Sequence, residues 1–219
     1  MKRITLLCCA TAFLVFACNN EKKADEAKTE PTANTETAST SPTGPPDSAA
    51  QAEMMKAWAD FATPGPEHAW MAKQAGTWVA DSVLQWMDPS QPPTVSKATD
   101  VVTMAINGLY QMTDFSSTMM GQPMQGHGIM GFDKMKKKFV LSWIDNMGSG
   151  IVRMEGSYDE TTKTLNMAGK QSDPGMKAET DIRQELKFHD DNSYTMSMYG
   201  TGHDGKEAKF MEGTFKRKK

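Results

Sequence analysis

Histidine is the residue type in this chain most able to ligate a metal or act as a general base. The four histidines, His68, His127, His189 and His203, are scattered without the pair spacing of a metal site. All three cysteines fall within the first eighteen residues, and no Gly-x-Ser-x-Gly, phosphate-loop or His-Glu-x-x-His motif occurs. We therefore predict no catalytic residue, no metal site and no cofactor, and we interpret the protein as a non-enzyme.

His127 is the histidine with the most unusual neighbours. Gly126 and Gly128 flank it inside a predicted strand, and residues without a side chain let a ligand or another backbone approach closely. We keep His127 as a candidate ligand-binding residue, with a structural role as the favoured alternative. His68 opens a predicted helix, where we expect it to cap the helix or to pack on Trp70.

Cys18 is the cysteine to which the sequence assigns a specific chemistry. Two basic residues precede an uncharged apolar run over residues 4–17. At about 1.5 Å per residue, this run is too short to cross a bilayer of about 30 Å and is typical of a secretory signal. The run ends in Ala17-Cys18, which resembles a bacterial lipobox, whose cysteine thiol receives a diacylglycerol. We predict a lipoprotein signal peptide over 1–17 and lipidation of Cys18; an ordinary signal peptide with an incidental cysteine is the alternative.

Residues 18–50 are predicted to form a disordered tether behind the lipidated cysteine. After Cys18 this segment contains no aromatic and no large aliphatic residue, so it cannot bury enough apolar surface to offset the entropy of ordering. The net charge of −3 argues against a nucleic-acid partner. We expect a protein held in the cell envelope by its lipid. Asn19 replaces the aspartate that retains enterobacterial lipoproteins at the inner membrane, which favours the outer membrane.

Residues 51–219 are predicted to form a single domain. Apolar residues at three- and four-residue spacing predict a helix over 52–61, and a second short helix begins at Pro66. After Gly76 the apolar period changes to two, which is the period of a strand. One face of this first strand is predicted to carry Trp78, Ala80, Ser82, Leu84 and Trp86.

Further alternating runs follow between tight turns such as Asn107-Gly108 and Asp173-Pro174-Gly175. Antiparallel strands joined by hairpins form a meander, and a long meander closes into a barrel because closure removes its edges. The sequence thus predicts a mainly β fold, an antiparallel up-and-down β-barrel with one or two short N-terminal helices. The interior of such a barrel is filled by side chains or holds a small ligand.

The start of the first predicted strand, Gly76-Thr77-Trp78, resembles the Gly-x-Trp motif of lipocalins and fatty-acid-binding proteins. In that superfamily a basic residue of the last strand packs over the tryptophan. The resemblance implies that Lys216 or Arg217, which follow Phe215, plays this part here.

A second resemblance covers nearly the whole domain and is specific only when its motifs are taken together. The chain resembles domain-of-unknown-function family 1579, which implies a calycin-like barrel and carries no established activity, substrate or catalytic residue. The motifs are Pro64-Gly65-Pro66-Glu67-His68-Ala69-Trp70, Gly76-Thr77-Trp78, Trp86-Met87-Asp88-Pro89, Gly121-Gln122-Pro123-Met124-Gln125-Gly126-His127-Gly128, Gly131-Phe132-Asp133 and Trp143-Ile144-Asp145-Asn146-Met147-Gly148-Ser149-Gly150.

Methionine is the compositional outlier, with 19 residues. Its flexible thioether fills an irregular core, lines an adaptable cavity, or binds monovalent copper, in that order of preference. Met119, Met120 and Met124 form the densest group. If the barrel is hollow, we expect its ligand to meet Trp78, Trp86, His127, Trp143, Gln184, Met196 and Met198, with Ser82 as a further inward polar group.

Two functions follow from these features. The first is a membrane-tethered barrel that binds a small, largely apolar molecule. The second is a structural or interaction protein whose barrel is filled by side chains and which acts through its surface. An enzyme ranks third, because no nucleophile is paired with a base.

Overall fold

The computed structural model describes residues 48–202 and 204–219, which belong to one compact unit. The predicted signal peptide, Cys18, nearly all of the predicted tether and His203 lie outside the described residues. Two helices come first, α1 (Ser48–Ala62) and α2 (Pro66–Lys73). Ten strands follow: β1 (Gly76–Gln85), β2 (Thr94–Ala105), β3 (Tyr110–Met119), β4 (Gln122–Asp133), β5 (Lys138–Asp145), β6 (Val152–Asp159), β7 (Thr164–Asp173), β8 (Ala178–Asp190), β9 (Ser193–Thr201) and β10 (Glu207–Arg217).

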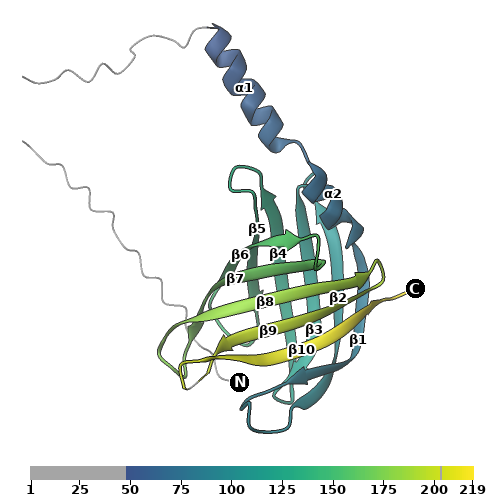
Figure 1. Cartoon of the computed structure of the whole chain (residues 1–219), viewed down its shortest axis with the longest axis vertical. Coiled ribbons are helices and arrows are strands. Elements are labelled where there is room, and N and C mark those ends of the chain that lie inside the picture. The colour runs from purple at the N-terminus through teal and green to yellow at the C-terminus, as the bar shows by residue number, and fades with distance from the viewer. Residues whose placement is uncertain (1–47, 203) are drawn as a thin grey trace, which may run out of the picture. The chain divides into compact units, whose positions relative to one another are not determined.

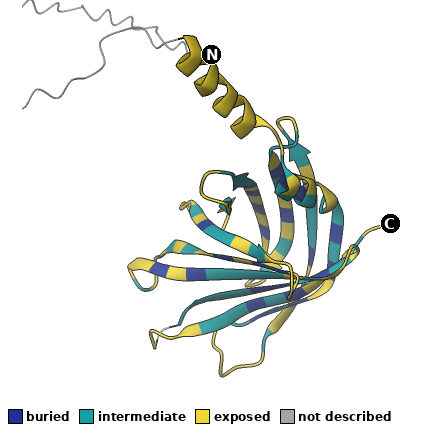
Figure 2. Ribbon diagram, turned by 45° about the horizontal axis from the view of Figure 1, so that its top comes forward, coloured by how far each residue is buried: buried dark blue, intermediate teal, exposed yellow. Residues whose placement is uncertain are grey.

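The strands form a closed antiparallel barrel in chain order, in which β1 pairs with both β2 and β10 (Figure 1). Closure leaves no strand edge without a partner, so the backbone polar groups of the sheet are satisfied within it. Buried and exposed residues alternate along the strands in Figure 2, as expected for a sheet with one face inside and one face in water. The predicted fold class is confirmed.

The helix α1 extends further than the predicted 52–61 and buries none of its residues (Figure 2). Its apolar side chains are exposed, with Met55 and Trp58 each 65% exposed. The helix α2 starts at Pro66, and the Gly65 N–H donates to His68 Nδ1 at 3.0 Å. His68 thus caps its own helix as predicted, and burial lowers its pKa.

A β-bulge changes which residues of β1 face the interior. The register of β1 shifts between Ala80 and Val83 against β2, which means that an extra residue is inserted there. Val83 is 0% exposed and Gln85 is 7% exposed, whereas Ser82 faces water. The predicted shared face is therefore right for Trp78 and Ala80 and wrong for the other three positions, Ser82, Leu84 and Trp86. A strict period of two cannot anticipate an inserted residue.

The strand β10 ends with an arginine that packs over the tryptophan of β1. The guanidinium carbon of Arg217 lies 4.1 Å from the centroid of the Trp78 ring, a cation–π contact. The same group donates to the backbone carbonyls of Ala75 at 2.6 Å and Lys73 at 2.8 Å. The basic counterpart implied by the lipocalin resemblance is thus Arg217, whereas Lys216 is exposed on the outer face.

Gly76 makes room for the packing of Arg217 over Trp78. Its φ of 143° lies in a region that favours glycine, and a Cβ atom there would stand 2.6 Å from Nη1 of Arg217. The backbone turn from α2 into β1 and the arginine therefore occupy space that a side chain at Gly76 would take.

We predict that Arg217→Ala lowers the free energy of unfolding by about 2 kcal/mol, because it removes the cation–π contact and several hydrogen bonds to carbonyls. Urea unfolding of the chain measures this loss. Lys216→Ala, one residue away on the outer face, is the matched control and should change stability by less than about 0.5 kcal/mol. Equal losses for the two variants would contradict the closing role of Arg217.

Candidate ligand-binding cavity

The barrel interior contains a cavity of about 260 Å³, so side chains do not fill it completely. Ligand pockets of proteins range from roughly 300 to 1,000 Å³, which places this cavity near the size needed for a small molecule. Its walls are mostly apolar, and methionine is the commonest lining residue. The eight lining methionines are Met119, Met124, Met130, Met147, Met154, Met196, Met198 and Met211.

The helix α2 closes one end of this cavity. Trp70 lies against three rings of the barrel, with centroid distances of 5.3 Å to Phe139, 4.6 Å to Tyr158 and 5.4 Å to Phe188. Met71 of the same helix is 0% exposed. These contacts make a solid floor, and Trp70 is the part of α2 that faces the cavity.

We infer that the opposite end of the barrel gives access to the cavity. The strands β3 and β5 end there, and the lining residues at their ends are Met119, Asp145 and Met147. Met147 lines the cavity and is also 36% exposed, and this observation carries the inference. Of the predicted methionine cluster, Met119 and Met124 line the cavity, whereas Met120 lies in the turn and is 55% exposed. The three thioethers therefore do not converge on one site.

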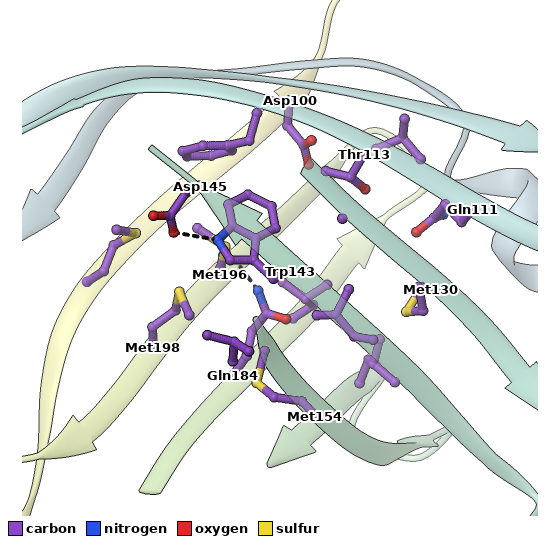
Figure 3. Close-up of a pocket in the computed structure, with 18 of the residues that line it drawn as sticks. Asp100, Gln111, Thr113, Met130, Trp143, Asp145, Met154, Gln184, Met196 and Met198 are labelled. Carbon is purple, nitrogen blue, oxygen red and sulfur yellow. Dashed lines mark hydrogen bonds between the residues drawn. The ribbon is translucent and has the colours of Figure 1, made fainter. Parts of the chain in front are cut away.

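Trp143 lies flat against the backbone of β4. A Cβ atom at Gly126 would overlap the indole ring, and one at Gly128 would lie 3.3 Å from it. The indole Nε1 donates to Asp145 Oδ2 at 2.8 Å, which fixes the ring's orientation (Figure 3). The two glycines thus make room for a tryptophan of the next strand rather than for a ligand at His127.

His127 lies on the outer face of the barrel, because it alternates with the two inward-facing glycines. Its Nδ1 is 2.6 Å from Asp114 Oδ1, and the two side chains are 64% and 66% exposed. The candidate role of His127 in the cavity is therefore wrong. Asp114, on the neighbouring strand β3, likewise faces water.

Trp86 also lies outside the cavity. It follows the bulge and the end of β1, and its backbone N–H donates to the carbonyl of Phe210 at 2.9 Å. The other five predicted residues, Trp78, Trp143, Gln184, Met196 and Met198, all line the cavity.

Gln184 is the polar member of this predicted set. Its Nε2 lies 3.4 Å from the sulfur of Met196, and Figure 3 shows the amide among Met154, Met196 and Met198. A sulfur is a weak acceptor, so the amide remains able to bond a ligand.

Asp100 is a charged lining residue that sequence reasoning missed. Its Oδ2 accepts a hydrogen bond from the Tyr194 hydroxyl at 3.0 Å, whereas its Oδ1 is buried without a partner. Burial raises the pKa of Asp100 to about 6, against an ordinary value of 3.8. Burial and the neighbouring carboxylate also raise the pKa of Tyr194 well above its usual range. The signal was present in the alternation of Ala98, Asp100 and Val102, which places an acid between two inward apolar residues.

No group of three or more His, Cys, Asp or Glu side chains is arranged to hold a metal ion within the described chain. None of the helices in residues 48–202 and 204–219 has the length and apolar character required to traverse a membrane.

These features define a closed antiparallel β-barrel protein with a hollow, apolar interior. The chain belongs to the family described as "Protein of unknown function (DUF1579)", whose model matches residues 63–217. The family predicted from the sequence motifs is confirmed. Among curated protein sequences, none matches this chain significantly.

One similar solved structure is the crystal structure of Rv2717c from M. tuberculosis. It shares 11% sequence identity with this chain, and the alignment covers 72% of this chain and 100% of that one with a TM-score of 0.54. At this identity the likeness is one of fold alone, and it agrees with the barrel architecture.

We predict that Asp100→Asn stabilises the protein at neutral pH. The pKa of Asp100 is about 6 in the folded chain and 3.8 when unperturbed, so between these values the folded chain binds more protons than the unfolded chain. The contribution of Asp100 to the free energy of unfolding is therefore greatest below about pH 4 and is lost as pH rises to about 6. The advantage of the variant should grow over this window by up to about 3 kcal/mol, at about 1.4 kcal/mol per pKa unit.

Urea unfolding of the two proteins between about pH 4 and pH 7.5 measures this difference. Asp81→Asn on the outer face of β1, where the side chain is 93% exposed, is the control and should follow the wild-type pH dependence. A stability difference between Asp100→Asn and the wild type that stays constant with pH would contradict the assignment.

Proposed function

We propose that this protein is a lipid-anchored cell-envelope protein that binds a small, largely apolar molecule inside its barrel. The cavity of about 260 Å³ carries this proposal, because a barrel interior left partly empty forfeits packing energy that a filled core would gain. The lining supports binding of an apolar molecule, since flexible methionines adapt to the shape of a ligand.

A binding role rather than catalysis is favoured by the kinds of residue in the cavity. The lining residues include no serine, cysteine, histidine, lysine or arginine. The hydroxyl bonded to Asp100 is that of Tyr194, whose raised pKa makes it a poor nucleophile. A few polar groups, among them Gln184 and Asp100, stand in an apolar wall, which is the usual composition of a binding pocket.

The proposed location in the cell envelope rests on the N-terminal sequence. The apolar run that ends at Cys18 supports export and lipidation, and the polar segment behind it supplies a tether to the barrel. The membrane is then the partner of the lipid chain, and the outer membrane is the favoured location. A barrel whose access lies at the end opposite α2 can take up a ligand from the cell envelope.

Ligand binding is tested with prodan, a neutral fluorescent probe whose emission increases in apolar surroundings. The protein is the predicted mature chain, residues 18–219, carrying Cys18→Ser so that no lipid competes for the probe. We predict that Thr113→Phe, which places a ring in the cavity wall, weakens prodan binding about tenfold, because overpacking costs about 1–3 kcal/mol.

The matched control is Thr118→Phe, the same substitution at an exposed position of the same strand, β3. It should leave the affinity for prodan unchanged. Equal affinities of prodan for both variants and the wild type would reject an interior binding site.

Lipidation is tested separately by growing a bacterial host with an alkyne-labelled palmitate. We predict that the wild-type chain takes up the label and sediments with membranes, and that Cys18→Ser does neither. Cys9→Ser, within the predicted signal peptide, is the matched control and should remain labelled. Labelling that persists in Cys18→Ser would refute the anchor without affecting the cavity.

A further inference from the structure

The carboxyl group of Asp100 is the most unusual feature of the cavity wall. It comes from β2, and the residues in register with it are Trp78 on β1 and Phe115 on β3. Figure 3 shows it beside Thr113, among the side chains that line the cavity. One carboxyl oxygen accepts from Tyr194, and the other is buried with no donor.

Such an arrangement costs free energy that no described residue offsets. A buried carboxylate is stable when donors or a positive charge satisfy both oxygens, and Asp100 has a single hydroxyl donor. The opposite charge that would complete it is absent from the wall, because no lysine, arginine or histidine lines the cavity. A ligand that brings a positive charge and hydrogen-bond donors would supply what is missing.

The second carboxylate of the cavity is already satisfied. Asp145 Oδ2 accepts from the Trp143 indole at 2.8 Å, and Oδ1 accepts from the Met147 backbone N–H at 2.9 Å. Asp145 therefore adds negative charge near the access without needing a partner of its own. Because the cavity has two carboxylates and no basic side chain, its interior is unfavourable for a fatty acid or a phosphate and favourable for a cation.

The aromatic residues near Asp100 add to this preference. Phe115 lies on the neighbouring strand and lines the cavity together with Tyr194, which donates to Asp100. Ring faces attract a cation through their quadrupole, and the attraction is greater where water is excluded. An ammonium group at Asp100 would thus meet both a carboxylate and aromatic surface.

We propose that the natural ligand is an apolar amine whose protonated nitrogen binds the carboxylate of Asp100 while its hydrocarbon part lies among the methionines. This assignment rests on the proposed function and names the class of molecule bound. The amine assignment distinguishes the protein from barrels that bind anionic lipids. Those barrels need positive charge inside, whereas this cavity carries negative charge.

The test compares decylamine, decanol and decanoic acid, which differ only in the head group, as competitors of prodan at about pH 7.5. We expect decylamine to displace prodan at a concentration about tenfold to a hundredfold below that of decanol, and decanoic acid to be the weakest. Asp100→Asn should bring decylamine to the level of decanol, with both competitors measured against the variant's own affinity for prodan. Asp81→Asn on the outer face is the control and should keep the wild-type preference.

The outcomes separate this inference from the proposed function. If prodan binds but decylamine is no better than decanol, or if its advantage survives in Asp100→Asn, the amine assignment is overturned and interior binding stands. If prodan fails to bind, decylamine is titrated directly by calorimetry. Saturable heat that Asp100→Asn abolishes supports the amine assignment, whereas the absence of such heat overturns both proposals.

Discussion

Closure of the sheet is the constraint on which the rest of this structure depends. Once β1 pairs with β10, every strand has two neighbours, and each residue must face either the interior or water. The covering of Trp78 by Arg217 joins the first strand to the last at the floor of the barrel, where Gly76 leaves the necessary space. The helix α2 then covers this end, and the exposed Met147 lies at the other.

The interior combines an adaptable apolar wall with two carboxylates, Asp100 and Asp145. Methionines and the indole of Trp143, which rests on the backbone at Gly126, give a surface that is apolar and irregular. Asp100 departs from this pattern, because its carboxyl group is held in the wall with one oxygen unsatisfied. A core selected for stability alone gains nothing from such a group, and the proposed ligand would supply the missing partner.

Much of the fold could be predicted from local patterns. The change of apolar period after Gly76 and the regular turns give the strands, and the family motifs give the barrel that the structure contains. The residues that line the cavity were predictable where the alternation runs without interruption, as for Gln184, Met196 and Met198. They were not predictable at Trp86, because the bulge after Ala80 reverses the faces of β1.

The sequence by itself determined the kinds of residue available: a predicted lipidation site at Cys18, a domain without cysteine, and many methionines and tryptophans in alternating strands. Only the tertiary structure decided which of them meet. In the folded chain His127 faces outward and contacts Asp114, and Trp143 occupies the space beside Gly126. Asp100 contacts Tyr194, which lies 94 residues away along the chain. These contacts join strands far apart in sequence, and no local period specifies them, because register and bulges are fixed only when the barrel closes.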